Sequence, residues 1–268
     1  MRYLLWTARL LAGLLAGTGW ALAGEPPLKV GTNASFFGPL EVAAAEAGKQ
    51  GLAVDVIEFN DPVAPNLTLA SGEIDANYFQ HALFLDMVNR ERHLDLLPYA
   101  EGIYGRTGLY SKKYGRLADL PVGARVALAG DPVNFGRGLR LLQQAGLIRL
   151  REGTAENASL ADVVDNPKKL VILEVDFHQL PLAVDDVDLA QEFAHFLIAA
   201  GTLDPHQALF WEPVTESRRY GIRFVIRPES RSDPRLARFV RIYQQSPVVR
   251  AALDRQYDDL YVRVWEQP

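Results

Sequence analysis

Short apolar segments alternate with amphipathic ones along nearly the whole chain, and this alternation constrains the fold more than any other feature. In the first part of the chain, strands are predicted at residues 28–32, 52–59 and 74–79. Helices are predicted at residues 39–49, with Pro39 in the first turn, and from the third strand through residue 89. Strands that alternate with helices form parallel βαβ units. The first part of the chain is therefore expected to be an α/β unit.

A second unit of the same kind begins near Gly108. From there to the end of the chain, strands are predicted at 109–111, 125–129, 169–175 and 223–227. Helices are predicted at 134–145, 185–200, 234–244 and 247–256. No linker-like segment separates the halves, so two α/β lobes joined by short crossovers are predicted. Ligands of such folds bind where the strand ends of both lobes meet. The expected binding place is a cleft between the lobes.

The first 23 residues have the pattern of a signal peptide. Arg2 and Arg9 give a positive start, residues 10–22 are almost wholly apolar, and residues 21–23 supply the small-x-small pattern of a cleavage site. The alternative is a membrane anchor, but the apolar stretch is short for a span and contains three glycines. We expect cleavage and export.

Composition excludes several classes of protein. The chain has no cysteine, so it can form no disulfide and offers no thiol for an amino-terminal lipid. A net charge of −5 and a pI near 5.6 argue against nucleic-acid binding, which needs a basic face. Phosphate-loop, dinucleotide, serine-hydrolase and zinc-protease motifs are absent from the sequence. We therefore expect neither enzymatic activity nor a cofactor.

Residues 75–81, Asp-Ala-Asn-Tyr-Phe-Gln-His, place a carboxylate, an amide, two aromatic rings and an imidazole within seven positions. Polar tips interleaved with aromatic faces at a strand end suit a small ligand that is part ionic and part apolar. The alternative is an aromatic strand end that only packs. From chemistry alone, both readings stay open.

Residues 130–137 are the second informative segment, because a strand ends there and Arg137 is predicted in the first turn of the next helix. Unpaired backbone N–H groups and the helix dipole favour an anion at that point. An arginine grips a carboxylate with two parallel hydrogen bonds. The partner of Arg137 is therefore either a ligand carboxylate or an internal Asp or Glu.

The five histidines of the chain are scattered, without a pair at helix-face spacing. A metal site could be assembled across the cleft from His81, His178 and His195. Lone histidines more often pack or lie on the surface, so no metal ligand is assigned.

At this point the sequence resembles the methionine-binding (NlpA-type) lipoprotein family, the solute-binding components of ABC importers, and it does so over nearly the whole mature chain. The segments that carry the resemblance, as they stand here, are 28–31 Leu-Lys-Val-Gly, 58–61 Glu-Phe-Asn-Asp, 65–66 Pro-Asn, 75–81 Asp-Ala-Asn-Tyr-Phe-Gln-His, 108–113 Gly-Leu-Tyr-Ser-Lys-Lys, Asp131-Pro132 with Asn134 and Arg137, 166–169 Asn-Pro-Lys-Lys, 179–181 Gln-Leu-Pro and 185–188 Asp-Asp-Val-Asp.

The resemblance implies a periplasmic-binding-protein fold in which two α/β lobes close on a ligand. We expect residues 27–106 plus 219–268 in lobe I and residues 107–218 in lobe II. The family further implies docking of a monomer on a membrane permease that has a cytoplasmic ATPase. It also implies ligand contacts for a set of residues that match its pocket motifs, namely Tyr78, Phe79, His81, Phe84, Asn134 and Arg137.

Departures from the family pattern point to a changed ligand. No lipidated cysteine follows the predicted cleavage site, so the protein is expected to be free in the periplasm. Two family asparagines that hold the amino-acid head group align with Phe193 and Ile222. An apolar side chain desolvates an ammonium without replacing its partners. We therefore predict a small carboxylate-bearing, amino-acid-like ligand that is not ordinary methionine. His195 either restores a polar partner near Phe193 or lies on the surface of its helix.

Two other functions stay open at this stage. One is a metal or metal-chelate binding protein that uses the histidines, and the other is an envelope protein that has lost transport duty and serves in sensing or protein interaction. An enzyme is the least favoured reading, because no nucleophile–base or paired-carboxylate arrangement can be assigned.

Overall fold

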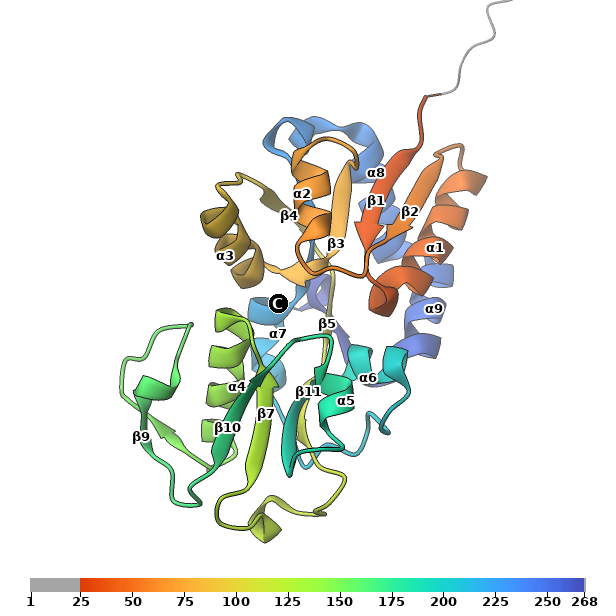
Figure 1. Ribbon diagram of the computed structural model, residues 1–268. Helices are drawn as coiled ribbons and strands as arrows, with labels where there is room; N and C mark the ends of the chain where they lie inside the picture. The colour runs from red at the N-terminus through yellow and green to blue at the C-terminus, as the bar shows by residue number, and fades with distance from the viewer. Residues whose placement is uncertain (1–24, 268) are drawn as a thin grey trace, which may run out of the picture.

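The structure is a computed structural model that describes residues 25–267 (Figure 1). The predicted signal peptide lies outside the described residues. Two five-stranded sheets form the centres of an upper and a lower lobe in Figure 1, which confirms the predicted two-lobed α/β architecture.

The first sheet has the strand order β2-β1-β3-β13-β4. Its strands are β1 (Leu28–Thr32), β2 (Val54–Glu58), β3 (Ala76–His81), β4 (Leu97–Glu101) and β13 (Ile222–Ile226). β1 runs parallel to β2 and β3, whereas β13 lies between β3 and β4 and is antiparallel to both. A strand from near the end of the chain therefore sits inside the sheet built by its beginning.

Helices cover both faces of the first sheet (Figure 1). They are α1 (Ala34–Lys49), α2 (Ala64–Ala70), α3 (Ala82–Arg92), α8 (Pro234–Gln245) and α9 (Pro247–Tyr257). One core joins Phe36 of α1, Phe239 of α8 and Leu253 of α9 to the sheet. On the other face, Leu69 of α2 and Leu85 of α3 pack together. The sheet is thus buried on both sides, as expected for parallel strands.

The second sheet has the strand order β10-β7-β11-β6-β12. Its strands are β6 (Thr107–Tyr110), β7 (Arg125–Ala129), β10 (Val171–Val175), β11 (Leu189–Phe193) and β12 (Phe210–Trp211). Helix α4 (Pro132–Gln144) packs on one face, and α5 (Leu180–Ala183) and α6 (Ala194–Ala200) lie on the other. A short hairpin of β8 (Arg149–Leu150) and β9 (Val163–Asp165) extends from this lobe.

The two sheets use separate parts of the chain. Residues 28–101 and 222–226 supply the first sheet, and residues 107–211 supply the second. This division is compatible with the predicted lobe boundaries, which remain a prediction. Between the sheets, β5 (Ile103–Gly105) pairs with β14 (Tyr261–Arg263), and α7 (Ser217–Tyr220) leads back to β13.

The predicted helix at residues 185–200 is wrong in its first half. Residues 189–193 form β11, which is fully buried and pairs with β7 on one side and β6 on the other. Backbone pairing with two neighbours decides the conformation there, although the apolar spacing also suits a helix. The helix begins only at Ala194.

The first helix begins earlier than predicted, at Ala34, so Pro39 lies inside it. The side chain of Asn33 caps the helix by accepting a hydrogen bond from the amide of Ser35. Pro39 has no N–H to donate to the carbonyl of Ser35, four residues earlier. That carbonyl instead accepts from Gln256 Nε2 at 2.9 Å and from the hydroxyl of Tyr257. Helix α9 thereby replaces the bond that α1 lacks.

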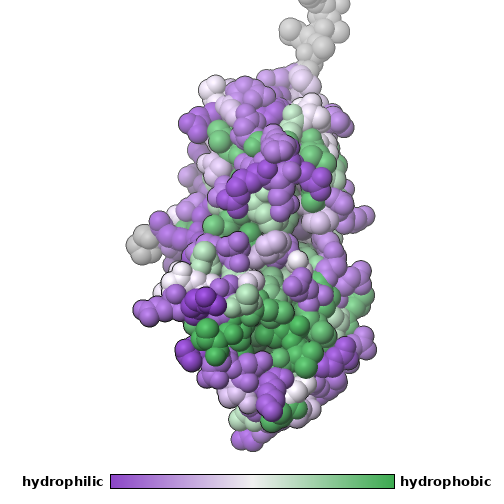
Figure 2. Space-filling view, turned by 60° about the vertical axis from the view of Figure 1, so that its left-hand side comes forward, coloured by the Kyte–Doolittle hydropathy of each residue, from purple (hydrophilic) through white to green (hydrophobic). Residues whose placement is uncertain are grey.

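The surface of the lower lobe presents a broad hydrophobic area on the face seen in Figure 2, whereas the upper lobe is mostly hydrophilic there. Exposed apolar side chains of the lower lobe include Leu160, Val164 and Val171. Among residues 25–267, none of the helices combines the length and apolarity that crossing a bilayer requires.

Candidate functional site

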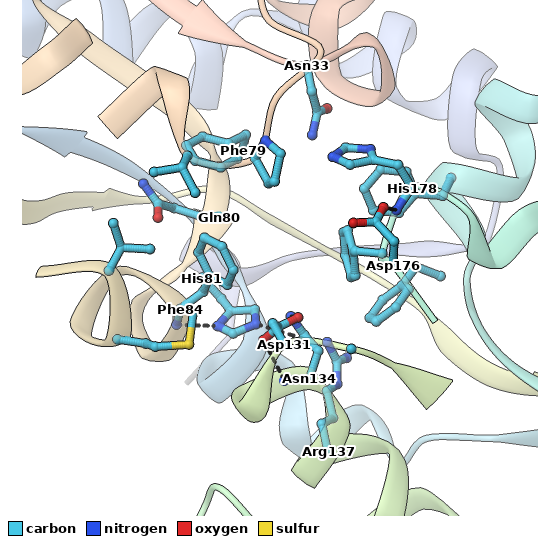
Figure 3. A pocket seen from close by; sticks show the side chains of 18 of the residues that line it. Asn33, Phe79, Gln80, His81, Phe84, Asp131, Asn134, Arg137, Asp176 and His178 are labelled. Atoms are coloured by element: carbon cyan, nitrogen blue, oxygen red, sulfur yellow. Dashed lines mark hydrogen bonds between the residues drawn. The ribbon is translucent and has the colours of Figure 1, made fainter. Parts of the chain in front are cut away.

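A cavity of about 460 Å³ lies where the two lobes meet (Figure 3). Its wall includes the end of β3, one face of α3, the start of α4 and the loop after β10. A volume of this size fits a small organic molecule. Eight of the nine predicted ligand-binding residues line it, namely Phe79, His81, Phe84, Asn134, Arg137, Phe193, His195 and Ile222.

The prediction that Tyr78 contacts the ligand is wrong, because Tyr78 does not line the cavity. Its ring is fully buried in the core of the first lobe. Its hydroxyl accepts hydrogen bonds from the amide of Ile103 and the hydroxyl of Tyr243, both at 2.9 Å. Successive side chains of a strand point to opposite faces, so the neighbouring Phe79 points away from this core and reaches the cavity. A register irregularity opposite Phe79 then brings Gln80 to the cavity as well.

A chain of hydrogen bonds fixes the state of His81 (Figure 3). Its Nδ1 accepts from the backbone amide of Phe84 and caps α3, so this nitrogen carries no proton. Nε2 therefore carries the proton and donates to Asn134 Oδ1 at 3.2 Å. Asn134 Nδ2 donates in turn to Asp131 Oδ2 at 2.9 Å. Burial and the charge of Arg137 lower the pKa of His81 to about 3, which keeps it neutral.

The anion partner of Arg137 is internal. Arg137 Nε donates to Glu212 Oε1 at 2.8 Å, and Nη2 donates both to Glu212 Oε2 and to the hydroxyl of Thr107. The hydroxyl of Tyr104 donates to Glu212 Oε2 at 2.6 Å. A ring stacks on the guanidinium, since its central carbon is 3.9 Å from the ring centre of Tyr220. Of the two partners left open by the sequence, the structure thus supplies the acidic side chain.

Arg137 also lies deeper in its helix than predicted. Helix α4 begins at Pro132, which puts Arg137 in the second turn. The carboxylate of Asp131 caps the helix by accepting from the amide of Asn134 at 2.9 Å. The helix start is therefore already occupied by an anion of the protein itself.

Phe193 and Ile222 both face the cavity, on β11 and β13 respectively. His195 also lines the cavity and is only 6% exposed, so of its two alternatives the surface position is excluded. It is the second residue of α6, a helix that packs against α1 of the other lobe. The ring centres of His195 and Phe36 of α1 are 4.9 Å apart.

The three histidines considered for a metal, His81, His178 and His195, all line the cavity. Their nitrogens do not come within 4.8 Å of one another as a set, and both nitrogens of His81 are used in hydrogen bonds. Within residues 25–267, the one cluster of converging His, Asp and Glu ligand atoms is exposed and lies outside the cavity, at His206, Asp258 and Asp259. A metal site built from the three histidines is therefore not formed.

Carboxylates outnumber unpaired cations on the cavity wall. The acidic residues that line it are Asp61, Glu91, Asp131, Glu174 and Asp176. The arginines are Arg92 and Arg137, and Glu212 neutralises the second. The wall therefore has no net positive charge. It disfavours a purely anionic ligand and tolerates one that carries both signs of charge.

Several lining residues were not predicted from the sequence. Met87, Val88 and Glu91 of α3 line the cavity together with Phe84. They stand three, four and seven positions after Phe84, which is the spacing of one helix face. That spacing could have been used to predict these three residues as cavity residues once Phe84 had been assigned to the cavity. Asn33 and residues 174–178, which are the end of β10 and the loop after it, carry no comparable pattern, because only the approach of the two lobes brings them to the cavity.

Two α/β lobes around a cavity at their strand ends form the two-lobed fold of periplasmic substrate-binding proteins. The chain belongs to the NlpA lipoprotein family, whose model matches residues 28–265. It is 36% identical over 248 residues to the D-methionine-binding lipoprotein MetQ of Escherichia coli K12, a match that covers 90% of this chain and 91% of that protein.

Solved structures agree with this assignment. A nutrient-binding protein from Burkholderia cenocepacia bound to methionine is 38% identical, with a TM-score of 0.81 and coverage of 88% of this chain and 99% of that chain. A periplasmic substrate-binding protein of an ABC transporter from Coxiella burnetii is 37% identical, with a TM-score of 0.83 and the same coverage. These are proteins that the chain is similar to, and they confirm the predicted family and fold.

Proposed function

We propose that this protein is the periplasmic solute-binding component of an ABC importer, which delivers its ligand to a membrane permease with a cytoplasmic ATPase. The observation that carries the proposal is the cavity between the lobes, whose wall combines aromatic rings with polar tips. The relatives described above include substrate-binding proteins that match this chain over most of their length. We further propose that the protein has no lipid anchor, because its 268 residues include no cysteine.

We propose that the ligand is small, amino-acid-like and bears a carboxylate. Arg137 lines the cavity, and its Nη1 makes no hydrogen bond to any described residue, although Nε and Nη2 are occupied. A ligand carboxylate would accept from Nη1 without displacing Glu212. It would gain a hydrogen bond from a charged donor, but little net attraction, since the Arg137–Glu212 pair is neutral.

We propose that ordinary methionine is not this ligand. Phe193 and Ile222 line the cavity and offer no side-chain hydrogen bond to an α-ammonium group. Two lost amide hydrogen bonds would cost about 2–4 kcal/mol, or roughly thirty- to a thousandfold in affinity. A positive group placed farther along the ligand would instead face the acidic part of the wall, at Asp176 and its neighbours (Figure 3).

A thermal-unfolding screen tests this function. The compounds are α-amino acids, ω-amino acids, short peptides and organic acids, and native mass spectrometry of freshly purified protein looks for a retained ligand. A true ligand at a hundred times its Kd adds about 2.7 kcal/mol to stability. We expect a carboxylate-bearing compound with a distant positive group to raise Tm more than methionine does. If no compound stabilises the protein and none co-purifies, the transport role is refuted.

A further inference from the structure

His195 is a buried imidazole without a hydrogen-bond partner among the described residues. Its Nδ1 is sealed from solvent and unpaired. Its Nε2 also makes no hydrogen bond, but it is not among the fully sealed atoms, and the side chain lines the cavity. Buried polar side-chain atoms are normally hydrogen-bonded, so an unpaired imidazole on a ligand cavity indicates a group that is meant to meet a ligand.

The surroundings of His195 keep its ring neutral. Aromatic rings lie around it, with ring centres 4.6 Å away for Phe196 and 4.9 Å for Phe36. Burial first, and then the charge of Arg137, lower the pKa of His195 to about 3. A neutral imidazole has one N–H donor and one acceptor nitrogen. The position of the single proton therefore decides what the ring offers to the cavity.

The backbone of Gly105 determines that position. A Cβ atom on Gly105 would stand only 2.3 Å from His195 Nδ1, so the α-hydrogen in its place points at this nitrogen. A proton on Nδ1 would collide with that hydrogen, whereas a lone pair accepts it as a weak C–H···N contact. The proton must therefore reside on Nε2, the nitrogen that is open to the cavity.

We propose that His195 Nε2–H donates a hydrogen bond to a carbonyl or carboxylate oxygen of the ligand, and so selects ligands that present an oxygen acceptor beside Phe193. The inference rests on the proposed function, because it requires a ligand in the cavity. It adds a donor on the side of the cavity where Phe193 and Ile222 offer none. A ligand with an ammonium group at this place would meet a donor and lose affinity.

The first test needs no ligand. Long-range ¹H–¹⁵N correlation spectra of the histidine-labelled protein identify the tautomer, and the His195→Gln variant assigns the signals. We expect His195 to be neutral with its proton on Nε2 at every pH from 5 to 8. A proton on Nδ1, or a charged ring at pH 6, overturns the proposal.

The second test uses two probes that differ in their oxygen acceptor, 6-aminohexanoate and 1,6-diaminohexane, in calorimetric titrations. His195→Phe should bind 6-aminohexanoate at least tenfold more weakly than the wild type. His195→Gln, whose amide N–H replaces Nε2–H, should bind it within about threefold. Neither variant should weaken the already poorer binding of the diamine, because the diamine offers no oxygen acceptor to Nε2–H. Equal affinity of the Phe variant and the wild type for 6-aminohexanoate overturns the proposal.

Gly105→Ala is an independent variant in which residue 195 is still a histidine. Its methyl group would displace the ring, so binding of 6-aminohexanoate should fall as in His195→Phe. Gly115→Ala is the matched control, since a Cβ there meets nothing within 4 Å. Unchanged binding in Gly105→Ala contradicts the role of Gly105. If the wild type itself ignores 6-aminohexanoate, the proposed ligand class fails, and the tautomer measurement alone decides the role of His195.

Discussion

The side chains of Arg137 and Glu212, which are 75 positions apart in the chain, form a buried two-pronged ion pair at the wall of the cavity. Both are at most 4% exposed. Tyr104 of β5 donates to Glu212, and Thr107 at the start of β6 accepts from Arg137. Tyr104 and Thr107 lie on the segment that runs from the first sheet to the second, and Glu212 lies on the segment that runs back from β12 to β13. The pair therefore links α4 to both of these connections.

Glu212→Gln should destabilise the protein markedly, because it leaves the buried guanidinium of Arg137 without a countercharge. The expected loss is roughly 3–5 kcal/mol in the free energy of unfolding. The same change should strengthen binding of carboxylate ligands, since Arg137 then keeps its full charge. Urea unfolding and ligand titration check both effects. Glu229→Gln is the control, because Glu229 pairs with Arg227 but is 69% exposed. Equal, small losses in the two variants would contradict the prediction.

Arg137→Met should be rescued in part by a second substitution. The single variant leaves the carboxylate of Glu212 buried and unpaired, whereas Arg137→Met with Glu212→Gln buries two neutral side chains. The double variant should therefore be more stable than Arg137→Met alone, although it carries one more change. The amide oxygen introduced by Glu212→Gln would still accept from Tyr104. Denaturant unfolding of the wild type, both single variants and the double variant measures the coupling. Additive losses would show that the pair does not act as a unit.

Tyr78→Phe should reduce stability but leave ligand affinity unchanged. The hydroxyl accepts from Ile103 and Tyr243 in the core, so its removal should cost about 1–3 kcal/mol. Phe79→Leu is the companion variant on the adjacent cavity residue. It should weaken ligand binding with a smaller effect on folding. A fall in affinity for Tyr78→Phe as large as that for Phe79→Leu would return Tyr78 to the site.

Glu192 should make stability depend on pH in the neutral range. It is fully buried in β11, neither carboxyl oxygen has a hydrogen-bond partner, and burial raises its pKa from 4.5 to about 8. Between these values the folded protein holds a proton that the unfolded chain has released. Stability therefore falls as pH rises through this window, by at most about 1.4 kcal/mol per pH unit.

Glu192→Gln removes this proton exchange, so the variant should gain stability relative to the wild type as pH is raised from 5 to 8. Urea unfolding at four pH values across that range provides the comparison. The exposed Glu41→Gln serves as control and should show no such trend. A stability difference between Glu192→Gln and the wild type that is the same at every pH would refute the assignment.

Periodicity predicted the architecture well where an element buries one face locally. The strand at 125–129 and the helices beginning at Pro234 and Pro247 have the bounds or starts that were expected. It failed at residues 189–193, where pairing with β7 and β6 outweighs a helix-compatible pattern. The start of α1 was missed because proline is common in the first turn of a helix. Inside the helix, Pro39 leaves the carbonyl of Ser35 without its usual donor, and Gln256 and Tyr257, far along the chain, supply the replacement.

The candidate site was predictable where one short segment carries both an aromatic ring and a polar side chain, as at Phe79 and His81. The side on which Tyr78 falls depends on strand pleating, which the motif alone does not reveal. Glu212 was missed as the partner of Arg137, because nothing near Arg137 in the sequence marks an acid so far away. The only local signal is a carboxylate directly after the aromatic strand β12.

The position of β13 has a consequence for how the protein is made. While only the first 220 residues have been exported, β3 and β4 have no strand between them, and both present bare edges to solvent. The amino-terminal lobe can close only after the carboxy-terminal segment emerges, whereas every strand of the second sheet is by then already available. The lobe that is synthesised first should therefore be the last to finish folding.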